Sequence, residues 1–364
     1  MKEPLLKHPT MVIHQAEPLN TGAPLAALRQ NYVTPQEYFF VRNHGTIPVV
    51  DTTTYCLSVT GMVERPLELS LEDLKAMPAT TEVALLQCAG IRRTEMAQVK
   101  PIPGELPWGA DPIGNAKWRG VPLCSVLDEA GVQDGAYHIA FKGLDEVWRH
   151  GEQVGFGGSI PLEKAADVLL AYEMNGETLP ATHGFPLRVI VPGDIGARSV
   201  KWLSTIHVQA SPSTNYFQAH AYKLFPPHIG PQNVDWNNGE MLGELPLNAV
   251  ICQPIEGAIC RTGPMMVQGY AVGQHEVPIE RIELSYDAGR SWIGATLLEQ
   301  QAWSWCFWEV LLELPAGPCE LIVRAWDVLQ HTQPEAIEQV WNFKGYMNNA
   351  WHRVHIMVQD EVSG

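Results

Sequence analysis

Apolar and polar positions predict alternating strands and short helices before about residue 210. YCLSVTGMV at 55–63 predicts a strand. SLEDLKAMP at 70–78 predicts a helix with Ser70 as its N-cap and Asp73 at the third position, and VPLCSVLDEAGV at 121–132 predicts a second helix that ends at Gly131. PLEKAADVLLAYEMNG predicts a helix that runs into a strand, and LRVIVPG is typical of a strand buried on both faces.

The pattern changes after about residue 210. RIELSYDAGRSW at 281–292 alternates around an Asp-Ala-Gly turn and predicts a hairpin. WCFWEVLLELPAG and CELIVRAWDV predict two further strands, and this spacing favours a β-sandwich. We place the boundary in SPSTN at 211–215, which divides the chain into domains 1–212 and 213–364.

Composition restricts the classes of partner. The 364 residues are 46% hydrophobic and 18% charged, with a net charge of −16, which argues against nucleic acid and anionic membranes. No apolar run approaches the roughly 18 residues of a membrane span, and we find no signal peptide. We therefore expect a cytoplasmic protein.

Seven cysteines with wide spacing and no CxxC motif argue against a disulfide scaffold and a structural zinc site. We expect most of them to be small buried hydrophobes. Cys88 lies in VALLQCAGIRRTEM, where Arg92 and Arg93 would favour a thiolate able to bind a soft metal. The alternative is a buried strand cysteine beside surface arginines. One cysteine cannot hold zinc or an iron–sulfur cluster, so a metal here needs further ligands, such as an organic chelate.

Two other segments combine cations with turns. In HGFPLRVIVPGDIGARSVKW at 183–202, a strand is followed by a turn carrying Arg198, Ser199 and Lys201, which suits a phosphate; Arg188 and His183 could reach the same anion. Ordinary surface cations would give the same pattern. In FFVRNHGTIP at 39–48, Arg42, Asn43 and His44 suit a buried polar site or a plain strand end.

Almost the whole chain resembles the sulfite oxidase family of molybdenum enzymes. The segments that carry the resemblance are FFVRNH (39–44), LLQCAGIRR (85–93), GSIPLEKA (158–165), the long block 169–203 and AWHRV (350–354). The resemblance implies an α+β chain: a mixed α/β molybdopterin-binding domain, then an immunoglobulin-like β-sandwich through which a homodimer forms.

The resemblance also implies the roles of individual residues. Cys88 would bind a molybdenum held by the dithiolene of a pterin cofactor, and Cys56 and Cys124 would be core residues. Arg42, Arg93 and Arg353, with Trp108 and Tyr222, would line the pocket for a small oxyanion. The cofactor would be held by Phe40, Val41, Arg42, Asn43, His44, Asp145, His183, Arg188, Ser199, Val200 and Lys201.

The implied activity is molybdenum-dependent oxidation of sulfite to sulfate by oxygen-atom transfer, with electrons passed to an external acceptor, either oxygen or a carrier protein. We expect no haem, because no CxxCH motif and no room for a haem domain are found. The alternatives are a nitrate reductase, which Arg353 disfavours, a sulfoxide-type reductase and a non-catalytic dimeric scaffold. One departure from the family pattern is Ile91, where the family usually has Asn.

Overall fold

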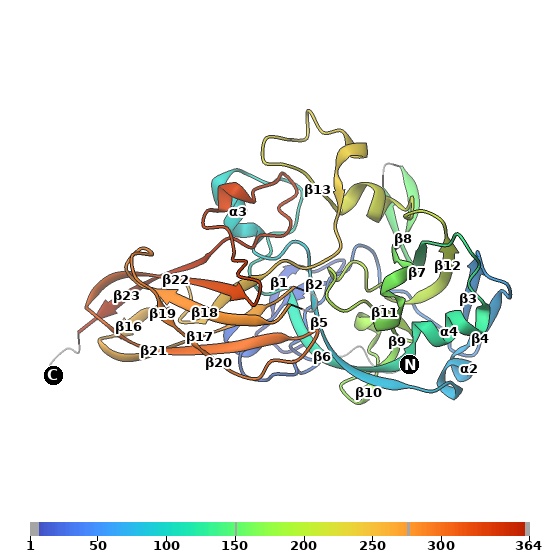
Figure 1. Cartoon of the computed structure of the whole chain (residues 1–364), viewed down its shortest axis with the longest axis horizontal. Coiled ribbons are helices and arrows are strands. Elements are labelled where there is room, and N and C mark those ends of the chain that lie inside the picture. Colours follow the sequence, from blue (N-terminus) through green and yellow to red (C-terminus); the bar gives the residue numbers. More distant parts are fainter. Residues whose placement is uncertain (1–6, 150, 275–276, 361–364) are drawn as a thin grey trace.

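A computed structural model describes residues 7–149, 151–274 and 277–360. Figure 1 shows two β-rich halves side by side, with the chain running from the right half, in blue to green, into the left half, in orange to red. No helix among the described residues is long and apolar enough to cross a membrane.

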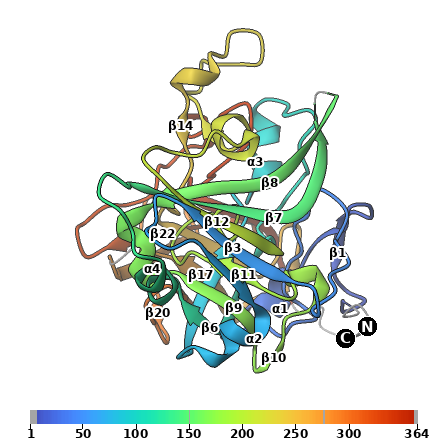
Figure 2. The ribbon, with the colours of Figure 1, turned by 90° about the vertical axis from the view of Figure 1, so that its right-hand side faces the viewer.

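The first half contains two five-stranded sheets. One has the order β10-β9-β6-β5, with β11 paired to β9, and the other has the order β4-β3-β12-β7-β8; Figure 2 looks onto this half with β7 and β8 in front. The first sheet comprises β5 (Thr80–Gln87), β6 (Ile113–Pro122), β9 (Leu169–Met174), β10 (Glu177–Thr178) and β11 (Arg188–Ile190). The second comprises β3 (Cys56–Gly61), β4 (Leu67–Ser70), β7 (His138–Arg149), β8 (Glu152–Pro161) and β12 (Leu203–Gln209).

Short helices connect these strands, and their ends agree with the sequence predictions. In α2 (Leu71–Ala76) the Ser70 hydroxyl accepts from the Asp73 backbone N–H, and the Asp73 carboxylate accepts from the Ser70 N–H, which completes a capping box. Helix α4 (Leu123–Ala130) ends at Gly131, whose φ of 71° is a conformation that glycine adopts without strain. The other helices are α1 (Leu25–Leu28), α3 (Arg93–Val99), the 3₁₀ helices η1 (Leu162–Asp167), η2 (Ala181–His183), η4 (Trp236–Asn238) and η5 (Ile337–Gln339), and the π-helix η3 (Phe217–Ala221).

The second half is a β-sandwich, as the alternation predicts. Its sheets have the orders β15-β17-β21-β20 and β16-β23-β22-β18-β19, and β18 and β19 form the predicted hairpin. The strands are β15 (Asn248–Gln253), β16 (Ile259–Arg261), β17 (Gly263–Val272), β18 (Ile279–Ser285), β19 (Ile293–Gly294), β20 (Thr296–Leu297), β21 (Trp305–Leu314), β22 (Gly317–Asp327) and β23 (His352–Gln359).

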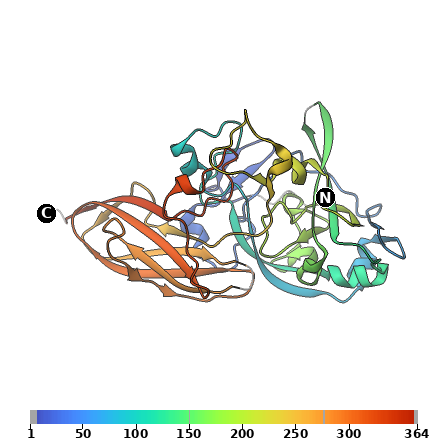
Figure 3. The same ribbon diagram turned by 45° about the horizontal axis from the view of Figure 1, so that its top comes forward.

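Two further segments lie outside these four sheets. The segment 215–247 contains η3, β13 (Lys223–Leu224), η4 and β14 (Glu240–Met241), and its Phe217, Tyr222 and Leu242 belong to the apolar core of the first half. The predicted boundary at residue 212 falls just before this segment. Near the N-terminus, β1 (Val12–Gln15) pairs with β2 (Asn20–Gly22), and Figure 3 shows this dark blue hairpin between the two halves.

Candidate active site

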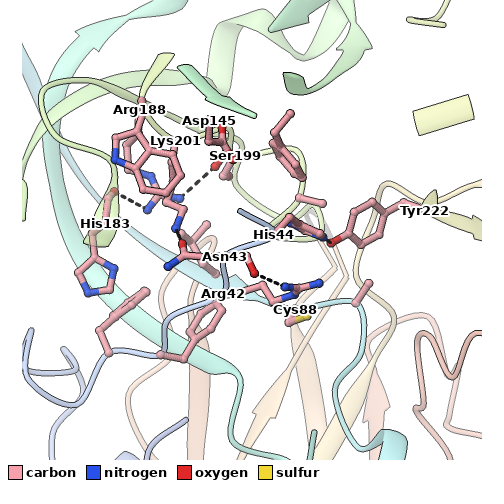
Figure 4. A pocket seen from close by; sticks show the side chains of 18 residues that line it. Arg42, Asn43, His44, Cys88, Asp145, His183, Arg188, Ser199, Lys201 and Tyr222 are labelled. Atoms are coloured by element: carbon pink, nitrogen blue, oxygen red, sulfur yellow. Dashed lines mark hydrogen bonds between the residues drawn. The ribbon is translucent and has the colours of Figure 1, made fainter. Parts of the chain in front are cut away.

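A cavity of about 660 Å³ opens among segments that lie far apart in the sequence. Figure 4 shows side chains that point toward a common space: Cys88 follows β5, Asp145 lies within β7, Arg188 begins β11, and Arg42, Asn43 and His44 belong to the segment before β3. Eleven of the residues expected at the site line it: Phe40, Arg42, Asn43, His44, Cys88, Asp145, His183, Arg188, Ser199, Lys201 and Tyr222. The folded chain therefore brings the Cys88 motif and the anion-binding turn to one place.

Cys88 follows directly on β5 and is 6% exposed. Its Sγ accepts from the Gly90 backbone N–H at 3.4 Å. A Cβ on Gly90 would lie 2.6 Å from the Arg93 guanidinium, so a glycine is required for this close approach. Ile91 is 1% exposed and packs in the apolar core, so its side chain does not line the cavity.

Cations dominate the inner end of the cavity. Arg188 donates from Nη1 to the His183 carbonyl at 2.9 Å and from Nη2 to the Ser199 carbonyl at 3.1 Å. Lys201 donates from Nζ to the Asn43 side-chain oxygen and to the Thr182 carbonyl. Burial lowers the pKa of Arg188 to about 9 and lowers the pKa of Lys201, which the Arg188 cation lowers further. Such a group of desolvated cations is stabilised by a bound anion.

His183 closes the same end of the cavity. Burial and the Lys7 cation lower its pKa, so the ring is neutral at pH 7. Lys7 donates from Nζ to His183 Nε2 at 2.7 Å and to the carbonyls of Gln36 and Phe39. Burial lowers the pKa of Lys7 to about 7.

Asp145 is the one acidic side chain in the lining of this cavity and is 5% exposed. Burial raises its pKa to about 6, an effect that the Lys201 cation opposes. Its Oδ1 has no hydrogen-bond partner within the described protein, and neither has the Thr182 hydroxyl. Buried acceptors without partners are expected where a ligand with N–H donors binds.

Tyr222 and His44 stand at the outer side of the cavity. The Tyr222 hydroxyl and His44 Nε2 lie 2.9 Å apart and share a hydrogen bond, visible in Figure 4. Burial, followed by the Arg42 cation, lowers the pKa of His44, while burial raises the pKa of Tyr222. Both groups are therefore neutral at pH 7, and the Tyr222 hydroxyl keeps its proton.

A second, wider cavity of about 1270 Å³ adjoins the first, because Arg42, Asn43 and His44 line both. Its wall includes Lys344 and Tyr346, which the sequence analysis missed. Lys344 forms an ion pair with Glu105, and the Tyr346 ring stacks on Tyr222 with 5.5 Å between centroids. In the sequence, both residues lie in FKGY at 343–346. This stretch shortly precedes AWHRV, the motif from which we took Arg353 as the site residue instead.

Arg353 is the expected site residue that the structure does not bring to the cavity. It lies on β23, opposite Ile322 of β22, and its Nη1 is 3.2 Å from a Glu320 carboxylate oxygen. The guanidinium is therefore held on the sandwich, and Lys344 rather than Arg353 lines the wider cavity together with Arg42.

Four more expected residues support the cavity from behind its wall. Arg93 donates to the carbonyls of Lys344, Gly345 and Leu106, and so fixes the position of the Lys344 backbone. Trp108 is fully buried, packs in the same apolar cluster as Cys88 and lies 4.4 Å from the His14 ring. Val41 and Val200 are buried in the core.

Arg92 is fully buried but contacts the second half of the molecule. Its Nη1 donates to Asn248 at 2.9 Å and to the Ala350 carbonyl at 2.7 Å, and its other nitrogens bind Glu95. Arg92 thus connects the two halves of the molecule, whereas Arg93 holds the backbone beside the wider cavity.

The other cysteines correct the sequence analysis in part. Cys56 is exposed and donates to Glu68 at 3.1 Å, so its assignment to the core is wrong. Cys124 is half-buried, and Cys252 and Cys306 are buried as expected. Cys260 and Cys319 are also only half-buried, so most of the cysteines are not core residues.

Comparisons with known proteins identify the class of the molecule. Residues 44–217 match the oxidoreductase molybdopterin binding domain, and residues 240–359 match the Mo-co oxidoreductase dimerisation domain. These matches define a two-domain molybdopterin oxidoreductase.

Individual relatives narrow the class. The chain is 38% identical to the sulfite oxidase of Arabidopsis thaliana, over 96% of this chain and 94% of that protein. It is 40% identical to the mitochondrial sulfite oxidase of Homo sapiens, over 97% of this chain and 67% of that protein. The solved structure of the sulfane dehydrogenase SoxCD from Paracoccus pantotrophus superposes with a TM-score of 0.78 at 25% identity, covering 98% of this chain and 89% of that one. The chain belongs to the sulfite oxidase family of molybdenum enzymes.

The residues of the cavity fit the molybdenum–molybdopterin cofactor of this family. No group of three or more His, Cys, Asp or Glu side chains among the described residues could hold a metal ion, so Cys88 needs ligands that the protein does not supply. Arg188, Lys201 and Ser199 suit the phosphate of such a cofactor, and the unpaired Asp145 oxygen suits its N–H donors.

Proposed function

We propose that this protein oxidises sulfite to sulfate with a molybdenum–molybdopterin cofactor and passes two electrons to an external acceptor. The observation that carries the proposal is the buried Cys88 thiol in a cavity lined by Arg42, Arg188 and Lys201. In the balanced reaction, sulfite and water give sulfate, two protons and two electrons. When bound, the cofactor supplies the oxygen transfer and accepts the electron pair.

Residues of the chain would bind and orient the substrate. Arg42 and Lys344 offer cationic donors to the oxygens of a compact dianion from the wider cavity, with Arg93 fixing the Lys344 backbone. Tyr222, which keeps its proton, can donate to a sulfite or sulfate oxygen while His44 holds the phenol in place. These fixed donors stabilise the charge on the substrate at little reorganisation cost.

In this proposal, the second half of the chain forms the interface of a homodimer. Its match to a dimerisation domain supports a homodimer. The identity of the electron acceptor and the cytoplasmic location stay predictions from the sequence. A nitrate reductase is not favoured: the enzyme of Hordeum vulgare is 36% identical over 97% of this chain but only 42% of its own length.

Sulfite turnover with and without air tests the function. We expect about one molybdenum per chain by metal analysis and sulfite-dependent reduction of ferricyanide in the absence of oxygen. Equal turnover with oxygen alone would identify an oxidase, whereas turnover only with the added acceptor would identify a dehydrogenase. A molybdenum-loaded protein that oxidises no sulfite under either condition contradicts the proposal.

A further inference from the structure

We propose that Asn20 is a positioning residue of the active site, which orients the cationic side chains through Arg42 and Asn43. The inference rests on the proposed function, because it treats Arg42 as a ligand of the substrate oxyanion. Asn20 lies outside residues 44–217, the part of the chain that matches the molybdopterin binding domain. Its side chain is fully buried between the N-terminal hairpin and the 41–43 segment.

The Asn20 side-chain oxygen accepts two hydrogen bonds from the site. Arg42 donates from Nη1 at 3.2 Å, and the backbone N–H of Asn43 donates at 2.8 Å. Arg42 Nη1 also donates to the Asn43 carbonyl at 2.5 Å. The same guanidinium nitrogen is therefore directed by two acceptors, while the Arg42 side chain as a whole lines both cavities.

The Asn20 amide is itself held in one orientation. Its Nδ2 donates to the Pro18 carbonyl at 2.8 Å and to the Gln15 side-chain oxygen at 3.1 Å. The next residue, Thr21, exchanges both backbone hydrogen bonds with Val41. Since both amide donors have acceptors on the N-terminal hairpin, the side-chain oxygen must face Arg42.

The same segment reaches a second cation of the cavity. Asn43 donates from Nδ2 to the Leu19 carbonyl at 3.1 Å, and this contact turns the Asn43 side-chain oxygen toward Lys201, which donates to it. Residues 19 and 20 thus determine the orientation of Arg42 directly and the acceptor of Lys201 through Asn43.

The physical benefit is preorganisation. A free arginine side chain samples many rotamers, and fixing it on binding costs conformational entropy. A hydrogen bond to a charged group is among the stronger ones in proteins. Loss of the Asn20 acceptor leaves Arg42 in place but mobile, so it weakens oxyanion binding and leaves the chemistry at Cys88 largely intact.

A double-mutant cycle with Asn20→Ala and Arg42→Met on the molybdenum-loaded enzyme tests the inference. We expect Asn20→Ala to raise the KM for sulfite about tenfold, to change kcat less than about twofold, and to weaken sulfate binding in titration calorimetry about tenfold. In the Arg42→Met background, Asn20→Ala should change the KM for sulfite and the affinity for sulfate by less than about a further twofold, because its effect passes through Arg42. Molybdenum content and the thermal midpoint are measured for every variant.

The control is Asn115→Ala, which removes another fully buried asparagine, one that donates to the Tyr32 carbonyl and lines neither cavity. It should lower the thermal midpoint without changing sulfate affinity. Should Asn20→Ala fail to load with molybdenum, Asn20→Ser carries the same test, with an expected loss of about threefold because the hydroxyl retains an acceptor.

Two outcomes overturn the inference while leaving the function intact: unchanged sulfate affinity in the loaded Asn20 variant, or effects of Asn20→Ala and Arg42→Met that multiply fully in the double mutant. Unchanged sulfate affinity in Arg42→Met overturns the role of Arg42 and the inference with it. Failure of the function itself shows separately, as a loaded wild-type enzyme that oxidises no sulfite.

Discussion

The two halves of the molecule differ in where they bury arginine side chains. The four buried arginines among the described residues, Arg92, Arg93, Arg188 and Arg198, all belong to the first half. In the sandwich, arginines pair with glutamates on or near the surface, as Arg324 does with Glu283 at 2.8 Å. Its separate core cluster is apolar throughout. Buried cations oppose folding unless they are compensated, and of these four arginines only Arg188 lines the inner cavity, where a bound anion would compensate its charge.

The largest effect is expected at Cys88. Cys88→Ser should lower sulfite turnover by well over about 100-fold, because even partners outside the ligand shell of a metal contribute about 10–100-fold to activity. Turnover with ferricyanide and molybdenum content are the measurements. Cys56→Ser, at the exposed cysteine, should leave both unchanged. Sulfite oxidation that survives Cys88→Ser would refute the ligand assignment.

A truncation in the sandwich core should separate stability from substrate binding. Leu321 is fully buried in the apolar cluster, so Leu321→Ala should lower the free energy of unfolding by about 2–5 kcal/mol. Urea unfolding measures this change, and the KM for sulfite of the folded enzyme should stay the same. A raised KM would mean that the sandwich core shapes the substrate site directly.

Acid should lower the stability of the protein through His352, a buried histidine of the sandwich that lies near Glu95 and Arg92 of the first half. Burial, and then the Arg92 cation, lowers the pKa of His352 to about 4, and its Nδ1 accepts from the Ile251 N–H at 3.1 Å. Because the unfolded chain takes up this proton near pH 6.5, stability is complete above that pH and falls by up to about 3 kcal/mol as the pH drops toward 4.

His352→Asn is the matched variant for this effect. It keeps a side-chain acceptor for Ile251 but cannot titrate. Its free energy of unfolding should depend less steeply on pH between 6.5 and 4 than that of the wild type. Parallel curves for the two proteins would remove His352 from the acid response.

The smallest effect distinguishes Lys344 from Arg353. Lys344→Met should raise the KM for sulfite about tenfold, the equivalent of about 1.4 kcal/mol of binding. Arg353→Met should leave the KM unchanged, because its partner is Glu320 on the sandwich. Steady-state kinetics of the two variants decide between the sequence-based assignment and the structural one.

Local patterns predicted the fold and the inner cavity well. The Ser70 cap, the Gly131 helix end and the hairpin at 281–292 depend on neighbouring residues, so the sequence is sufficient for them. Within the His183–Lys201 segment, Arg188 donates to the carbonyls of His183 and Ser199, so this part of the cavity is also local in sequence. Lys344 and Asn20 could not be predicted in this way, because each acts through contacts with residues far along the chain.

The position of Arg92 bears on whether the first half of this enzyme can be separated from the sandwich. One step along the chain from Ile91, its backbone takes a φ of 57°, and its guanidinium extends across to the Ala350 carbonyl in the other half. Excising the sandwich would remove the Asn248 and Ala350 acceptors of the Arg92 guanidinium, four residues from the Cys88 thiol. A first half cut free at the boundary between the domains is therefore expected to lose the present shape of the 88–93 segment, so the sandwich supports the candidate site as well as matching a dimerisation domain.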